Sequence, residues 1–441
     1  MSPPEPAGAP RVDTRRIFVI AGPAMLANLT TPLLGIVSTA AIGQLGEARL
    51  LGGVALASVA FDCVFWLFGF LRMATVAFAA QALGAGDRLE VRAVLVRALL
   101  LAAAIGLSLI ALRAPLGALI FSAMGGSAAV TAAATDYFHI RLWSAPFMLG
   151  NYVILGWLVG QARTGRALAI QVGINLVNMA LTLFLVLGLR WGIAGAATAT
   201  VAAETAGFIA GLATAHRLLG SFRIPRALLL DRARWLRMLA VNRDIMIRTA
   251  ALIGGFLFFT AQGARAGDQI LAANAVLYNF LMIGSFFLDG LANAAEQLCG
   301  QSFGARDSRQ FSQAVRLVLR WSLGFGAAVT LALGLAGPLL IDLMTSSPEV
   351  RLTARGFMPY AALAPAFGVL AYCFDGVFIG ASWARDMRNL MVLAFAIFIA
   401  SWFALTPLEN TGLWIAFLIF QLARGVLQAL RYPSLRRAAF A

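Results

Sequence analysis

This chain of 441 residues is 61% hydrophobic and only 12% charged, which leaves too few polar side chains to cover a core in water. Its net charge of +15 comes from arginine, because the sequence contains no lysine. A nucleic-acid-binding role would need a soluble basic domain with base-reading groups, and the sequence has none. The composition therefore predicts a protein that works inside a membrane.

Apolar stretches of membrane-spanning length fill almost the whole chain, and short loops separate them. A helix needs about 20 mostly apolar residues to cross a bilayer core of about 30 Å, and lipid cannot satisfy an open backbone. Each stretch is therefore predicted to be a transmembrane helix. We place the twelve helices at residues 17–43, 51–81, 92–122, 135–160, 167–188, 192–215, 245–264, 270–300, 313–343, 356–382, 389–406 and 411–430.

Arginine is distributed unevenly between the two ends of these spans. Most arginines fall in or beside the even-numbered loops and the termini, and the positive-inside rule places that side in the cytoplasm. We therefore expect an inner (cytoplasmic) membrane protein with both termini cytoplasmic. Its expected parts are a tail (1–16), a first lobe (17–215), an amphipathic linker on the cytoplasmic membrane surface (216–243), a second lobe (244–430) and a second tail (431–441).

The two halves of the chain repeat one another. Gln81-Ala-Leu-Gly84, at the end of the second span, is matched 220 residues later by Gln301-Ser-Phe-Gly304, at the end of the eighth. Six helices separate the copies, an even number, so both halves enter the membrane in the same direction. The predicted fold is an all-α membrane protein with 12 transmembrane helices in two parallel six-helix lobes, which suits alternating access better than a channel.

Five motifs, spread from the first span to the tenth, can be compared with a known family. They are Asn28-Leu-Thr-Thr-Pro-Leu-Leu-Gly-Ile-Val37, Phe70-Leu-Arg-Met-Ala74, Asn242-Arg-Asp-Ile-Met-Ile-Arg248, Leu288-Asp-Gly-Leu-Ala292 with Glu296, and Asp375-Gly-Val-Phe-Ile-Gly380. In these motifs the chain resembles the multidrug and toxic compound extrusion (MATE) transporters, and within them the DinF-like branch. The resemblance implies the MATE fold of two six-helix lobes and export of cationic or amphipathic compounds, driven by inward flow of protons or sodium.

The first lobe departs from the family at two positions. Relatives commonly carry aspartate in a Val-Asp-Thr stretch of the first helix, where this chain has Ser38. They also carry one four residues after an asparagine of the fifth helix, where Asn178 is followed by Thr182. Serine and threonine cannot exchange a proton near neutral pH. We predict that the cavity of this lobe contains a polar cluster of Ser38, Asn175, Asn178, Thr182, Thr200 and Glu204.

Three carboxylates remain at membrane depth in the second lobe, where an ionised side chain costs about 3 kcal/mol or more. Asp289 and Glu296 are seven residues apart and therefore on one face of the eighth helix, and Asp375 lies inside the tenth. Burial disfavours the ionised form of a carboxyl group, so all three are candidates for proton coupling. The alternative for each is a structural role, as a helix cap or as the partner of an arginine.

Other polar groups in the spans allow weaker inferences. Glu204, in the sixth helix, could serve transport or could form a hydrogen bond that packs the lobe. Asp244 and Arg248 have the spacing of an i,i+4 ion pair at the start of the seventh helix. The sequence has no metal-ligand spacing and no phosphate-binding loop, so we expect no metal site, no cofactor, no enzymatic activity and no ATP-driven pumping.

The sequence thus predicts a secondary active transporter, expected to be a monomer, that exports organic cations or amphiphiles through the lipid bilayer. Because both amino-terminal carboxylates are missing, we expect coupling to protons rather than to Na⁺. Two alternatives stay open. One is a flippase for lipid-linked precursors, which arginines lining the cavity would favour, with Arg72 as the strong candidate; the other is a non-transporting membrane scaffold or sensor.

Overall fold

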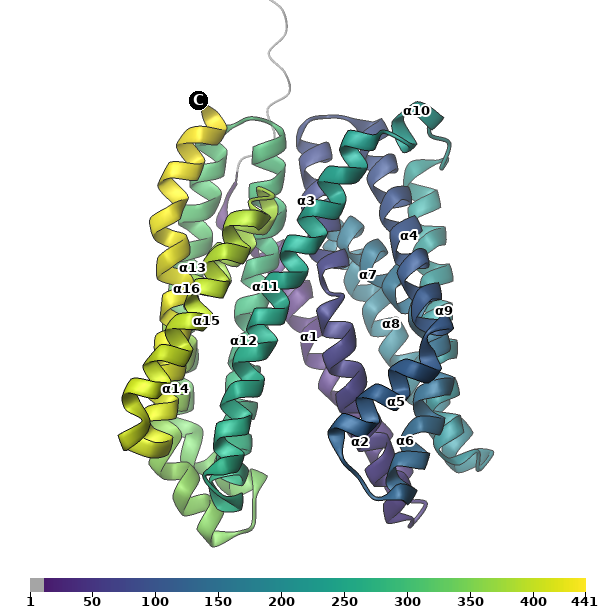
Figure 1. Cartoon of the computed structure of the whole chain (residues 1–441). Helices are drawn as coiled ribbons and strands as arrows, with labels where there is room; N and C mark the ends of the chain where they lie inside the picture. Colours follow the sequence, from purple (N-terminus) through teal and green to yellow (C-terminus); the bar gives the residue numbers. More distant parts are fainter. Residues whose placement is uncertain (1–11) are drawn as a thin grey trace, which may run out of the picture. The chain divides into compact units, whose positions relative to one another are not determined.

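The computed structural model describes residues 12–441, without the side chains of residues 29, 31 and 32. Every regular element in that part of the chain is helical (Figure 1). Of the expected tail at 1–16, residues 1–11 lie outside the described residues.

The helices follow the predicted spans closely. Those of the first half are α1 (Thr14–Gly43), α2 (Ala48–Leu67), α3 (Phe70–Gly84), α4 (Arg88–Ala111), α5 (Arg113–Met124), α6 (Ala128–Arg141), α7 (Ala145–Gly160), α8 (Thr164–Leu183) and α9 (Gly192–Leu219). Those of the second half are α10 (Arg226–Leu229), α11 (Arg232–Arg265), α12 (Asp268–Gly304), α13 (Ser308–Met344), α14 (Pro348–Gly380), α15 (Ala384–Leu405) and α16 (Glu409–Phe440).

Within the described residues, eleven segments are long and apolar enough to cross a membrane. The last of them, Ala384–Phe440, contains two helices, α15 and α16, that meet at Thr406–Leu408. The prediction of twelve spans is therefore confirmed. The stretch expected to form a linker, 216–243, holds the end of α9, the short α10 and the first turns of α11, which continues without a break into the seventh span.

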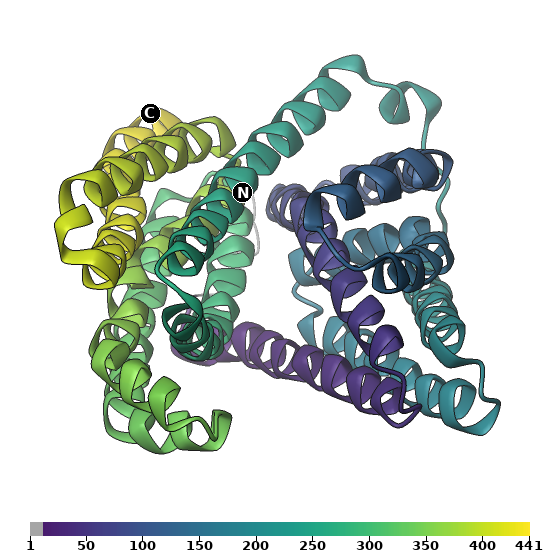
Figure 2. The same ribbon diagram turned by 60° about the horizontal axis from the view of Figure 1, so that its bottom comes forward.

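The contacts between helices define two compact units (Figures 1 and 2). The amino-terminal unit contains Leu26–Leu83 and Asp87–Leu239, and the carboxy-terminal unit contains Ala240–Ala441 with the start of α1 and Gly84–Gly86. Each is a bundle of long helices that run side by side. The carboxy-terminal unit has an aromatic core in which Phe259, for example, meets the ring of Trp414 edge to face at 4.9 Å.

The 220-residue repeat is visible in how the helices begin. Asp87 and Asp307 each accept a hydrogen bond from the backbone N–H three residues further on, at 2.9 and 2.8 Å. Ser127 and Ser347 do the same at 3.3 and 3.5 Å. A side-chain oxygen at this position satisfies a backbone donor that has no partner inside the helix. Equivalent caps therefore start equivalent helices in both halves.

The repeat is also visible in helix packing, because glycines of the fourth and tenth spans lie directly against the backbone of the second and eighth. A Cβ atom at any of them would collide with a carbonyl oxygen of the facing helix. The contacts are Gly156 with Arg72, Gly160 with Val76, Gly376 with Ala292, and Gly380 with Glu296. Both members of each pair shift by 220 residues between the halves. The predicted repeat is thus confirmed in three dimensions.

The halves differ in the continuity of these spans. In the amino-terminal unit the fourth span is broken at Leu142–Ser144, a single 3-10 turn between α6 and α7. Its counterpart α14 runs unbroken, although Pro359 and Pro365 lie inside it. The break places Arg141 at the end of α6, in the middle of the span.

Candidate functional site

Asp375 lies at the centre of a buried ionic network in the carboxy-terminal unit. Its Oδ2 accepts hydrogen bonds from Arg248 of α11 and from Nη2 of Arg424 of α16, the latter at 3.1 Å. Its Oδ1 accepts from Nε2 of Gln428 at 2.7 Å. Asp375 is 6% exposed and the two arginines are 5% and 3% exposed. The network joins α11, α14 and α16 at membrane depth.

The network holds one more positive charge than negative charge. Arg248 and Arg424 share the carboxylate of Asp375, and protonation would remove the countercharge of both. Further groups around Arg424 stabilise its positive charge. Its Nη1 donates to Oε1 of Gln421 at 2.7 Å, and its guanidinium lies 5.9 and 5.6 Å from the ring centroids of Tyr372 and Phe420. Both distances are within the range of cation–π attraction.

The expected i,i+4 pair between Asp244 and Arg248 is wrong. Asp244 instead accepts from Nη1 of Arg388 at 2.6 Å and from Nη2 of Arg243 at 3.0 Å. Arg248 donates to Asp375, which, like Asp244, is buried and accepts from a guanidinium group of another helix. Pairing with an arginine, the alternative considered for Asp375, is therefore what the structure contains.

The other two predicted carboxylates lie on α12 in different surroundings. Glu296 is buried, 3% exposed, where the backbone of α12 meets Gly380. Asp289 has an exposed side chain and acts electrostatically on Tyr372, whose hydroxyl lies 2.5 Å from Oγ of Ser285. Asp289 and Glu296, which the sequence analysis proposed for the same role, thus differ in solvent exposure.

The structure brings only part of the predicted amino-terminal polar cluster together. Thr182 donates from Oγ1 to Oδ1 of Asn178 at 3.1 Å, and Asn178 donates from Nδ2 to Oγ1 of Thr200 at 3.2 Å. All three are buried. Asn175 belongs to a second group, because its Nδ2 donates to Oγ1 of Thr30 on α1 at 2.7 Å.

The two remaining members lie apart from this chain of hydrogen bonds. Ser38 is half-buried on α1 and, among the described side chains, is not hydrogen-bonded to another member of the cluster. Glu204 accepts a hydrogen bond of 2.7 Å from Nδ2 of Asn151 on α7, which also donates to the carbonyl oxygen of Glu204 at 2.9 Å. The cluster is therefore several separate polar groups rather than one site.

Arg141 is a charged group at membrane depth that the sequence analysis did not select. Its guanidinium lies 4.3 Å from the ring centroid of Phe61 and 5.7 Å from that of Tyr137, to whose hydroxyl Nη1 donates at 3.4 Å. Its Nε is buried and has no hydrogen-bond partner. An arginine inside the predicted span 135–160 was the available indication.

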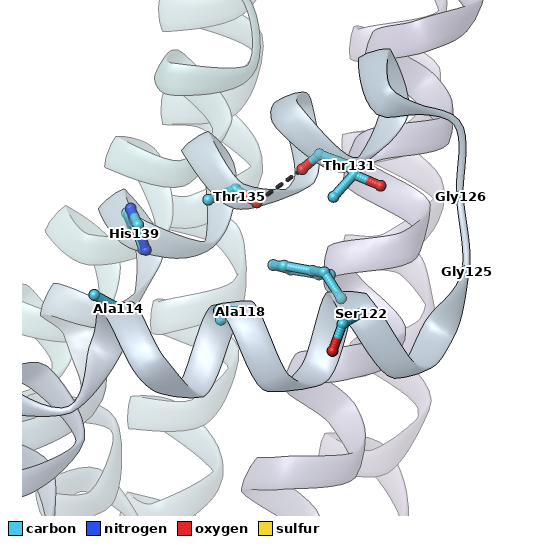
Figure 3. A pocket seen from close by; sticks show the side chains of 10 residues that line it. Ala114, Ala118, Ser122, Gly125, Gly126, Thr131, Thr135 and His139 are labelled. Carbon is cyan, nitrogen blue, oxygen red and sulfur yellow. Dashed lines mark hydrogen bonds between the residues drawn. The ribbon is translucent and has the colours of Figure 1, made fainter.

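A cavity of about 480 Å³ opens between α5 and α6, away from these groups (Figure 3). His139 lies at one end and Gly125 and Gly126 at the other, with Thr131 and Thr135 along the wall. Oγ1 of Thr135 donates to the carbonyl oxygen of Thr131 at 2.8 Å, and Oγ of Ser122 donates to that of Leu119 at 2.9 Å. Nε2 of His139, in contrast, is buried without a hydrogen-bond partner. None of the predicted site residues lines this cavity.

Comparison with known proteins shows extensive similarity. The family model MatE matches residues 23–184 and 245–403. The chain is 38% identical over 414 residues to DNA damage-inducible protein F of Escherichia coli (strain K12), covering 93% of this chain and 90% of that protein. It is 27% identical over 448 residues to "Probable multidrug resistance protein NorM" of Rhizobium meliloti (strain 1021), covering 95% and 92%.

Among solved structures, a MATE protein in the bent conformation matches with a TM-score of 0.89 over 97% of both chains, at 18% identity. This similarity in fold agrees with the twelve spans and the parallel repeat. The family match extends over both halves, from the first span to the eleventh. The chain therefore belongs to the MatE family, the multidrug and toxic compound extrusion family of membrane proteins, which are transporters and not enzymes.

Proposed function

We propose that this chain is a secondary active transporter that exports amphipathic or cationic organic compounds in exchange for protons. The observation that carries the proposal is the network around Asp375, because charged groups at membrane depth are costly and mark transport sites. The similarity to a relative named for multidrug resistance supports the substrate class.

The network offers a physical link between a proton and the arrangement of helices. Protonation of Asp375 would leave Arg248 and Arg424 without their shared countercharge, so the bonds that join α11, α14 and α16 would weaken. A proton arriving from outside would in this way favour one arrangement of the carboxy-terminal unit, and its release inside would restore the other. Asp289 and Glu296, on the neighbouring α12, are the further carboxyl groups that this mechanism can use.

Protons suit the amino-terminal unit better than Na⁺. The hydroxyl and amide oxygens of Thr182, Asn178 and Thr200 are hydrogen-bonded to one another, and none of them carries a charge. A sodium site built on these three residues would need these bonds to open and would have no anionic ligand among them. The coupling ion is therefore expected to be the proton.

Transport into proteoliposomes with an imposed gradient tests the proposal. Purified protein should drive the movement of a fluorescent organic cation when a pH gradient is imposed, and a protonophore should abolish it. Replacing Na⁺ by K⁺ or choline should have no effect. A strict requirement for Na⁺ would overturn proton coupling, and equal rates with protein-free vesicles would overturn transport of that substrate.

A second candidate is favoured by one observation, the number of arginines inside the spans. Arg141, Arg248 and Arg424 are all buried or half-buried at membrane depth, in addition to Arg72. Such groups suit an anionic headgroup, as in a lipid-linked precursor. Competition between a fluorescent cation and an anionic amphiphile in the same proteoliposomes separates the two, because only the preferred class should inhibit at low concentration.

We also place the protein in the inner membrane, as a monomer, with both termini cytoplasmic. Arg436 and Arg437 near the end of α16 support this orientation by the positive-inside rule. A single cysteine introduced at Ala441, in a variant with the three native cysteines replaced, should react with a membrane-impermeant maleimide only after the cells are opened.

A further inference from the structure

The amino-terminal unit has kept one carboxyl group at depth whose surroundings differ from those of Asp375. Glu204 lies in the middle of α9 (Gly192–Leu219) and is hydrogen-bonded to the neutral amide of Asn151. Among the described residues, no arginine or histidine forms an ion pair with it. An amide can donate to this group in either protonation state, because a protonated carboxyl group keeps an oxygen that accepts.

Glu204 also lies next to the remaining polar groups of its unit. It follows Thr200 by one helical turn, and Thr200 ends the hydrogen-bonded chain from Thr182 through Asn178. The buried face of α9 runs through Thr200, Ala203 and Gly207, and Glu204 borders it. The carboxyl group therefore lies one turn from this hydrogen-bonded chain, although its own hydrogen bond is to Asn151.

Arg141 provides a charge for this carboxyl group. The break in the fourth span leaves Arg141 at the carboxyl end of α6, which packs against α9, and its Nε is buried without a partner. The guanidinium is near enough to act electrostatically on Glu204, yet it lies against the rings of Phe61 and Tyr137 rather than in an ion pair. A guanidinium group whose Nε has no acceptor thus lies on the helix that packs against α9, and, among the described residues, Glu204 of α9 has no cation in an ion pair.

Other titratable groups around Glu204 do not replace this pair. The hydroxyl of Tyr152 on α7 interacts electrostatically with Glu204 and with three further charged groups, Arg72, Asp62 and Arg141. These charged groups therefore all lie within electrostatic range of one tyrosine. Asp62 on α2 is also within electrostatic range of Arg141, but its side chain is exposed and forms no ion pair with it. α8 also packs against α9, and its one arginine is Arg166 in its first turn. Arg166 lies beside Thr214, about three turns from Glu204 along α9.

We propose that Glu204 is the proton-exchange group of the amino-terminal unit, and that Arg141 is its countercharge when it is ionised. The inference rests on the proton antiport proposed above and names a site for it in this unit. A proton from water outside would bind the Glu204 carboxylate, which keeps its bond to Asn151. On release of the proton towards the cytoplasm, the carboxylate would be stabilised by the guanidinium of Arg141.

Labelling with dicyclohexylcarbodiimide tests this without any transport measurement, because the reagent attacks protonated carboxyl groups in apolar surroundings. We expect mass spectrometry of purified protein to find the adduct on Glu204, with a yield that falls as the pH is raised from about 5 to 9. Arg141→Gln should extend labelling to higher pH, because the ionised form loses its countercharge, and Arg141→Lys should restore the original profile. Asp136→Asn, an exposed acid on the same α6, is the matched control and should change nothing.

Transport measurements then separate this inference from the proposed function. Glu204→Gln should lose pH-gradient-driven efflux while still binding substrate, with an affinity that no longer depends on pH. If wild-type protein is proton-driven but Glu204 does not label, or labels equally at every pH, the inference is wrong and the proposed function stands. If Glu204 titrates as expected but no proton-driven transport is found, the site stands and the proposed function fails.

Discussion

Asp375 and Arg248 are 127 residues apart, on α14 and α11, and form a hydrogen-bonded ion pair inside the carboxy-terminal unit. Arg424 of α16 shares the same carboxylate oxygen. A single carboxyl group is therefore the countercharge of two arginines. Replacing it has consequences for stability as well as for coupling.

We predict that Asp375→Asn destabilises the protein, because it leaves two buried guanidinium groups unpaired. Breaking a buried ion pair costs about 3 to 5 kcal/mol. Asp375→Asn combined with Arg424→Gln returns the network to its original net charge and should recover part of that loss. Thermal unfolding in detergent is the measurement, and Asp386→Asn, which breaks a partly exposed pair with Arg431, is the control. Equal melting temperatures for wild type and Asp375→Asn would contradict the prediction.

The close helix packing of each half gives a second prediction. Gly376→Ala should destabilise the protein by about 1 to 3 kcal/mol, because the new methyl group meets the carbonyl oxygen of Ala292. Gly324→Ala, in α13, has open space around it and should be neutral or slightly stabilising. Gly156→Ala should behave like Gly376→Ala, since it occupies the equivalent contact in the other half. The three variants are compared by melting temperature after purification.

Rebuilding the acids that relatives carry gives a third prediction. In Ser38→Asp with Thr182→Asp, the new carboxylate at 182 would lie beside Oδ1 of Asn178, which now accepts from Thr182 at 3.1 Å. Carboxylates buried in apolar surroundings favour a bound cation, and a cation bound only by the folded state raises the melting temperature by mass action. A Na⁺ titration at fixed ionic strength should slope upward in the double variant and stay flat in wild type. A slope in wild type would show that the neutral oxygens alone bind the ion.

A fourth prediction concerns a buried amide pair in the carboxy-terminal unit. Asn274 and Asn410 donate to each other at 2.8 and 3.1 Å, and Nε1 of Trp414 donates to Asn274 at 3.0 Å. Asn274→Leu leaves both partners unsatisfied and should cost about 1 to 3 kcal/mol for each buried group. Asn274→Leu with Asn410→Leu should cost less than the sum of the single changes. Additive losses in a double-mutant cycle would show that the pair is not coupled.

Much of the fold follows from local patterns in the sequence. The twelve spans depend on the length of apolar stretches, and the repeat depends on short motifs such as Gln81–Gly84 and Gln301–Gly304. Both survive in three dimensions because the membrane requires helices of this length and because the same caps and glycines occur at the same offset. Neither prediction requires knowing which helices are in contact.

The site was less predictable, because partner choice depends on tertiary packing. Spacing made Asp244 a reasonable partner for Arg248, but Asp244 pairs with Arg388 of α15 and Arg248 pairs with Asp375 of α14. Both carboxylates are buried, so helix packing rather than exposure decides the partner. Arg424, inside the apolar span 411–430, was the one indication that Asp375 has a second cation. Asp289 and Glu296 lie on one face of α12 but two turns apart along its axis. Their different exposures therefore follow from the neighbours packed at each level, which a seven-residue spacing leaves open.

The glycine contacts have a mechanical consequence for transport. Gly376 follows Asp375 directly and contacts the backbone of α12, and Gly380 makes the same contact one turn further on. Neither glycine has a side chain that could change rotamer to let the two helices separate there. We therefore expect α12 and α14 to move together at this end, so that a change of charge at Asp375 displaces both.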